Sequence, residues 1–150
     1  MAGYTLVRQV MPLLLLLNNS TPYHEVLLST AKELVKQGHP AMAVVAANTA
    51  CEYYVERALS KAMSRAGLTQ PVEEAVSHLL PGYNLADRRV RSLYSALTGD
   101  AVHQQPFWSD FTTCVKVRND VVHRGARASV QQAETAVAAA ESLLRHLAAV

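Results

Sequence analysis

Apolar residues recur along most of the chain at intervals of three and four positions, which is the spacing of one face of an α-helix. The clearest stripe lies between 40 and 65 and consists of Val44, Cys51, Val55, Leu59 and Ala62. No stretch alternates apolar and polar residues in the manner of a half-buried strand. The pattern therefore predicts an all-α fold, an up-and-down helical bundle of about five helices plus one short helix.

Proline, glycine and capping residues divide this pattern into helices. Asn84 with Asp87 three residues later resembles a capping box, and Ser129 with Gln132 is a proper one. The expected helices run from Pro22 to Gly38, from Pro40 to about Arg65, from Pro71 to Pro81, from Asn84 to Gly99, from Pro106 to Gly125 and from Ser129 onward. We expect the second, fifth and sixth of these helices to form the centre of the bundle.

The first residues differ from the rest, so we divide the chain into an N-terminal arm, 1–19, and a helical bundle, 20–150. The stretch from Val10 to Leu17 is apolar and contains five consecutive leucines. It is about half as long as a membrane span, and it lacks the basic start and small-residue cleavage site of a signal peptide. We expect the arm to pack on the body or on a partner protomer, in a cytoplasmic protein without a membrane segment.

Composition indicates a hydrophobic core, a surface for self-association and a reducing compartment. Of the 150 residues, 50% are hydrophobic and only 17% are charged, which is less charge than a soluble domain usually carries. A surface for self-association, and hence a homodimer, fits this deficit. Cys51 and Cys114 show no CxxC spacing and are expected to be buried thiols in a reducing compartment. The six histidines show no metal-ligand spacing, so we expect neither a metal nor another cofactor.

Positive charge is clustered although the formal net charge is only +2. A binder of nucleic acid that ignores sequence would usually be more basic. One cluster comprises Arg88, Arg89 and Arg91, and the other comprises Lys116, Arg118, Arg124 and Arg127. Each cluster is either a solvated helix face or part of an RNA-binding surface.

The segment Arg118-Asn119-Asp120-Val121-Val122-His123, followed by Arg124-Gly125, carries most of the chemistry of the chain. It places a guanidinium, an amide and an imidazole within six positions; these groups bind a phosphate, orient it and move a proton. A purely structural interpretation also exists. The helix macrodipole favours a histidine in the last turn, and Arg118 could pair with Glu52 or Asp120.

Helical geometry limits how these side chains can act together. Asn119 and His123 are four residues apart and share a face, whereas Arg118 lies about 140° from His123 around the axis. Either the helix frays before Gly125 and turns His123 round, or a two-fold partner brings a second copy of the segment close.

This segment resembles the Arg-x4-His signature of the HEPN family, small all-helical domains that are often metal-independent ribonucleases. The polar residue that commonly follows the arginine is Asn119 here, and the alanine-rich run 47–55, with Glu52 inside it, looks like the second helix of that family. The resemblance covers roughly residues 20–148. It implies a bundle of four to five helices whose active site forms at the interface of a homodimer.

The resemblance also implies a reaction, in which RNA is cleaved by its own 2′-hydroxyl to give a 2′,3′-cyclic phosphate. His123 would be the general acid or base, Arg118 would clamp the non-bridging oxygens, and Asn119 would hold the phosphate or set the His123 tautomer. Glu52 shares a face with Asn48 in an alanine-rich helix. It is either an exposed glutamate or, if that face is buried, a carboxylate that needs a cationic partner, for which Arg118 is the best candidate, so that the pair would fix the rotamer of the arginine. Asp120 would be a second supporting carboxylate. The expected role is defence or toxin-type growth control, with an antitoxin or another protein as a possible partner.

One position departs from the pattern of the family. Some members carry a tyrosine two residues after the histidine, which a nucleotidyltransferase antitoxin modifies, and Gly125 stands there in this chain. Control of that type is therefore in doubt. The alternatives to a ribonuclease are a non-catalytic dimerisation module that binds RNA, nucleotide or a partner protein, and a purely structural bundle.

Overall fold

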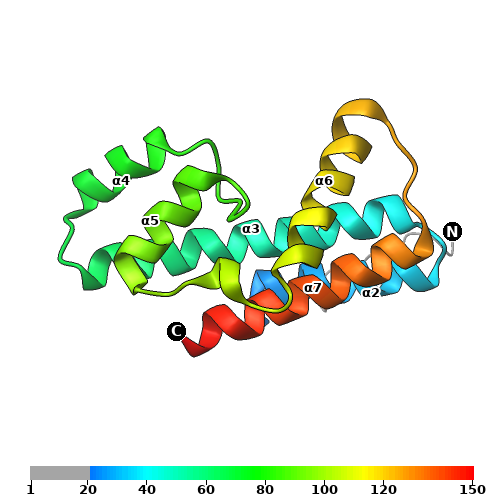
Figure 1. Ribbon diagram of the computed structural model, residues 1–150, viewed down its shortest axis with the longest axis horizontal. Coiled ribbons are helices and arrows are strands. Elements are labelled where there is room, and N and C mark those ends of the chain that lie inside the picture. Colours follow the sequence, from blue (N-terminus) through cyan, green and yellow to red (C-terminus); the bar gives the residue numbers. More distant parts are fainter. Residues whose placement is uncertain (1–20) are drawn as a thin grey trace, which may run out of the picture.

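The computed structural model describes residues 21–150, and in this part of the chain the regular elements are all helices, with no strand (Figure 1). The elements are α2 (Tyr23–Lys36), α3 (Pro40–Arg65), α4 (Gln70–Leu79), α5 (Arg88–Thr98), the 3-10 turn η1 (Val102–Gln104), α6 (Trp108–Arg124) and α7 (Val130–Ala149). The predicted all-α bundle is confirmed. The expected N-terminal arm with its leucine run lies outside the described residues.

The long helix α3 is the axis on which the other helices pack (Figure 1). α2 runs back along the first half of α3, α7 lies beside both, and α6 crosses α3 and α7. α4 and α5 occupy the opposite end of α3. Buried alanines such as Ala43 and Ala47 in α3 and Ala136 and Ala140 in α7 leave room for close approach of these helices. The expected centre of α3, α6 and α7 is present, and α2 joins it.

The ends of the helices lie within two residues of the predicted ones, except at the start of α5. α3 has the expected bounds, and α7 begins with the expected capping box, in which the Ser129 hydroxyl accepts from the Gln132 amide at 3.1 Å. The N-cap of α5 is Asp87, not Asn84, because Asp87 accepts from the Arg89 amide at 2.8 Å. The Asn84 carboxamide instead accepts from the amide of Ala86, two residues on, and so closes a turn before the helix.

The core contains most of the residues that the apolar stripes predicted. All five stripe residues of α3 are buried, as are the two cysteines. Among the large apolar residues, Tyr23 and Val130 are 50% and 48% exposed. Each is the first residue of its helix, where a helix projects past its neighbours. None of the described helices is long and apolar enough to cross a membrane.

A partly buried polar cluster joins α5, the following loop and α7. The carboxylate of Asp100 accepts from the Tyr94 hydroxyl at 2.9 Å and lies 2.7 Å from Nε2 of His146. The ring of His146 also contacts Phe107 edge-on, with centroids 5.7 Å apart. Because Asp100 and His146 are 46 residues apart in the chain, spacing alone did not predict this contact.

Candidate functional site

The Arg118–His123 segment lies on the half of α6 that projects from the bundle. Phe111, Cys114 and Val115 anchor the first half of α6 in the core, and no residue of α6 after Val115 is buried. In Figure 1 this second half rises away from α3 and α7 before the chain returns to α7. The segment is therefore presented to the surroundings on a continuous helix.

The helix stays regular past His123, so fraying does not bring the side chains of the segment together. α6 ends only at Arg124, and Gly125 adopts the left-handed conformation with φ 62°. The amides of Gly125 and Ala126 donate to the carbonyls of Val121 and Asp120 at 3.2 and 3.1 Å, which closes the helix end. The first of the two ways to unite Arg118 with His123 is thereby excluded for the described conformation.

Glu52 on α3 holds Arg118, as the sequence predicted. Nη2 of Arg118 lies 3.5 Å from Oε2 of Glu52, and Nη1 donates to Oδ1 of Asn119 at 3.1 Å. The two charged side chains are 24% and 29% exposed, and Nε of Arg118 is buried without a partner among the described residues. The contact fixes the rotamer of the arginine, while its partial exposure limits its stabilising effect to about 1 kcal/mol or less.

His123 lies apart from this pair. It is exposed, and its imidazole forms no hydrogen bond with another residue of 21–150. On a continuous helix it shares a face with Asn119 and lies about 140° from Arg118. One protomer therefore does not direct His123 and Arg118 toward the same phosphate.

The other predicted residues lie on α6 and its following loop and on α5. Asp120 pairs with Arg124, four residues later, at 3.2 Å. Of the two partners considered for Arg118, the structure therefore shows Glu52 and not Asp120. Lys116 in the middle of α6, Arg124 at its end and Arg127 in the following loop are exposed and add positive charge on either side of the segment in the chain.

The second arginine cluster lies on α5, and its side chains contact other groups than Arg118 or are exposed. Arg88 and Arg89 are exposed at the start of α5, and Arg89 lies 3.7 Å from Asp87. Arg91 donates to the carbonyls of Leu85 and Ala86 at 3.2 and 3.1 Å and stacks over Trp108, the first residue of α6, at 5.4 Å. Ten residues of helix, about 15 Å, separate Trp108 from Arg118. Arg91 therefore holds the turn before α5 rather than contributing to a site at Arg118.

Among the described residues, the recess next to Glu52 is too small for a substrate. The recess there is lined by Asn48, Glu52, Tyr83 and Phe111 among others and has no room for a water molecule. Asn48 is buried, and its amide donates to the Val44 carbonyl of its own helix at 3.0 Å. A much larger groove lies elsewhere, at the far end of α3.

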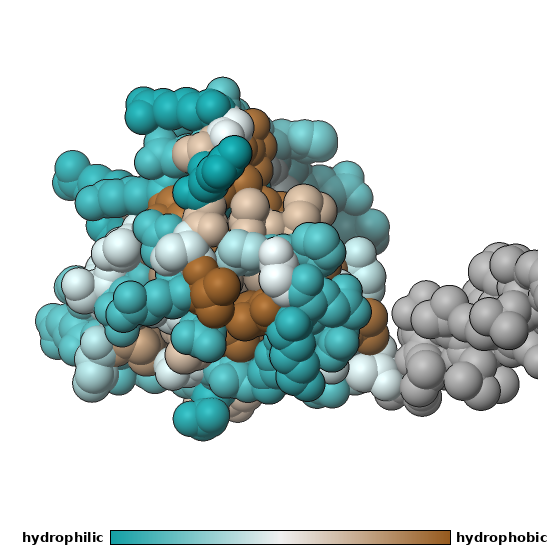
Figure 2. Space-filling view, turned by 90° about the vertical axis from the view of Figure 1, so that its right-hand side faces the viewer, coloured by the Kyte–Doolittle hydropathy of each residue, from teal (hydrophilic) through white to brown (hydrophobic). Residues whose placement is uncertain are grey.

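Apolar side chains are exposed on the same side of the molecule as the segment. Val122, within the segment, is 50% exposed, Met42 at the start of α3 is 59% exposed, and Val130 at the start of α7 is 48% exposed. Figure 2 shows apolar atoms among the polar ones on this side.

The described residues contain no group of three or more histidine, cysteine, aspartate or glutamate side chains that could hold a metal ion. Comparison of the chain with protein-family models, with curated proteins and with solved structures gives no match. The resemblance to the HEPN signature therefore remains a prediction from the residues themselves.

Proposed function

We propose that this protein is a metal-independent endoribonuclease that acts as a homodimer through the projecting half of α6. The observation that carries the proposal is the placement of Arg118. Its guanidinium is fixed by Glu52 and Asn119 yet partly exposed, on a helix whose last turn presents His123 to solvent. These are a phosphate-binding group and a proton-transfer group on one continuous helix.

The proposed reaction uses the nucleophile that RNA itself carries. The 2′-hydroxyl loses its proton and attacks the adjacent phosphorus, the P–O5′ bond breaks, and the 5′-oxygen takes up a proton. The products are a 2′,3′-cyclic phosphate and a 5′-hydroxyl. His123 would transfer a proton as general acid or base, and Arg118 with Asn119 would stabilise the charge on the non-bridging oxygens.

A second protomer would complete the site. Arg118 and His123 diverge on one helix, so a two-fold contact between two α6 helices would set Arg118 of one copy against His123 of the other. Val122 lies between them in sequence and, with Met42 and Val130, offers apolar surface for such a contact. The low content of charged residues supports the same arrangement.

The test is cleavage of end-labelled RNA in excess EDTA. Wild-type protein should cleave it, and His123→Ala and Arg118→Ala should each reduce the rate by about 100-fold or more. His103→Ala is the matched control, since His103 is also exposed but lies on η1, and it should cleave normally. Cleavage that survives either substitution in folded protein would refute the proposal.

Mixing the two inactive proteins tests the shared site. A dimer of one His123→Ala chain and one Arg118→Ala chain has one site with both groups intact, so mixing should restore part of the activity. Failure of exchanged subunits to regain any activity would refute a site that is shared in this way.

The second candidate function is a non-catalytic dimerisation module that binds RNA, nucleotide or a partner protein. It is favoured by the lack of a cleft at Glu52 and by the engagement of Arg118 with that carboxylate. It predicts stable dimers and no cleavage by any variant.

The proposed role in defence or growth control has its own test. Expression of wild-type protein should arrest bacterial growth, and expression of His123→Ala should not.

A further inference from the structure

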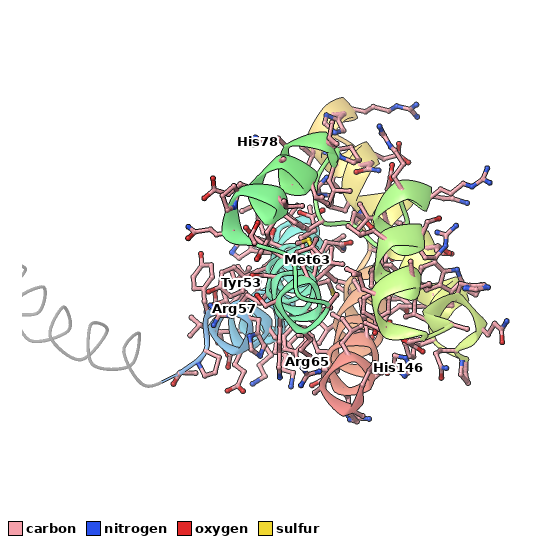
Figure 3. The ribbon with its side chains drawn as sticks, turned by 90° about the vertical axis from the view of Figure 1, so that its left-hand side faces the viewer. Tyr53, Arg57, Met63, Arg65, His78 and His146 are labelled. Atoms are coloured by element: carbon pink, nitrogen blue, oxygen red, sulfur yellow. The ribbon has the colours of Figure 1, made fainter. Side chains whose placement is uncertain are left out.

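A groove of about 1090 Å³ opens at the end of α3 that is far from Arg118. It exists because α2 has 14 residues and α3 has 26, so α2 covers only the first half of α3. The start of α2, the second half of α3, α5 and the end of α7 line the groove. Figure 3 views this end of the molecule and labels Tyr53, Arg57 and Arg65 on α3.

Three cations line the groove in one row. Arg57, Lys61 and Arg65 are four residues apart on α3 and all are exposed. Each step of four residues advances about 6 Å along the helix, a spacing similar to that of successive phosphates in an extended nucleic-acid strand. Glu56 is the one carboxylate side chain in this lining. Lys61 and Arg65 form no salt bridge with any residue of 21–150.

Aromatic side chains lie next to Arg57, the first cation of this row. Nη1 of Arg57 donates to the Tyr53 hydroxyl at 3.3 Å, and its guanidinium carbon lies 5.8 Å from the centre of that ring. Tyr54 packs edge-on against His24 with centroids 4.7 Å apart, and both rings line the groove. Tyr23, which is half exposed, packs against Tyr53 in the same way at 5.1 Å.

We propose that this groove binds single-stranded nucleic acid, with the phosphates along Arg57, Lys61 and Arg65 and the bases against the tyrosines. A cationic track beside aromatic rings is the combination that single strands require, since every base can stack on a ring. An acidic peptide would need the cations but not the rings. The biological role, to hold the RNA substrate away from the reacting phosphate, rests on the proposed ribonuclease function, whereas binding itself does not require cleavage.

The experiment measures the fluorescence anisotropy of a labelled single-stranded RNA of about ten nucleotides, with the full chain carrying His123→Ala to prevent cleavage. Lys61→Gln with Arg65→Gln should weaken binding about tenfold or more and lower the slope of log K against log salt by about 1.4, since each phosphate contact to a single strand contributes about 0.7. Lys36→Gln with Arg145→Gln removes the same charge outside the groove from two exposed side chains and should change both quantities much less. Thermal unfolding of both double variants should match that of the parent.

The outcomes separate this proposal from the ribonuclease proposal. Equal losses of RNA affinity in the two double variants, or no RNA binding by the full chain, would refute the proposal that the groove binds RNA. Displacement of the RNA by polyglutamate as readily as by unlabelled RNA would refute it as well. In the cleaving protein the groove variant should raise KM and leave kcat unchanged. If RNA binds through Lys61 and Arg65 but is never cleaved, the groove stands and the ribonuclease proposal falls.

Discussion

Replacing Asp100 by alanine would remove the carboxylate that joins Tyr94 on α5 to His146 on α7. The Tyr94 side chain is 2% exposed, and those of His146 and Asp100 are 19% and 12% exposed. Water therefore cannot fully replace the lost contacts. We expect the substitution to lower the free energy of unfolding of the whole bundle, because it leaves a buried hydroxyl without its acceptor.

The magnitude follows from the two hydrogen bonds, at 2.9 and 2.7 Å. A hydrogen bond to a charged group contributes about 1.5–3 kcal/mol, and removing the aspartate also relieves its own cost of burial. We therefore expect a net loss of about 2–3 kcal/mol. For a chain of this length that loss corresponds to a fall in Tm of about 4–12 °C.

Urea and thermal unfolding followed by circular dichroism would measure this loss. A double-mutant cycle with His146→Ala should give a coupling energy of about 1 kcal/mol, because both residues share one contact. Glu134→Ala, which removes an exposed carboxylate from α7, is the control and should stay within about 0.5 kcal/mol of wild type. An Asp100→Ala protein as stable as this control, or a coupling energy near zero, would refute the reasoning.

Three further predictions concern burial and capping. Burial raises the pKa of Cys114 to about 11 and raises that of Cys51 as well, so at pH 8 both thiols should react with a disulfide reagent only as fast as the protein unfolds. Stability should also fall as pH rises from about 9 to about 11, since the unfolded thiol of Cys114 ionises first. Burial lowers the pKa of His24 below 6.5, so stability should decline as pH falls through 6.5, and His24→Phe should flatten that decline. Ser129→Ala should cost about 1 kcal/mol in urea unfolding through loss of the α7 cap.

Each of these has a result that would contradict it. Rapid labelling of a cysteine in protein that remains folded would show that the thiols are accessible. An unchanged pH profile in His24→Phe would assign the acid sensitivity to other groups. A Ser129→Ala protein as stable as Ser129→Thr, which keeps the hydroxyl, would mean that the capping box contributes nothing.

The helices could be predicted from the sequence because their ends are marked by local chemistry. Pro40 and Gly67 bracket α3, and Ser129 with Gln132 caps α7, without reference to any distant residue. The start of α5 was wrong because two capping residues, Asn84 and Asp87, lie close together and only the fold decides which one caps the helix.

The site was predictable only in part, for a similar reason. The Glu52–Arg118 contact followed from burial of charge within an alanine-rich helix, and it is present. The groove was not foreseen, although Tyr53, Arg57, Lys61 and Arg65 repeat at four-residue spacing. That signal also describes a solvated helix face, and only the short length of α2 turns it into a groove.

The division of α6 into an anchored and a projecting half has a consequence in time as well as in space. Amides near Cys114 can exchange their hydrogens only when the core opens, whereas those between Arg118 and Arg124 need only a local opening of the helix end. Exchange in the isolated protomer should therefore change from slow to fast along one continuous helix. Docking of any molecule on the projecting half would slow hydrogen exchange of the fast amides alone. The exchange rates of these amides would therefore measure binding at this half of α6.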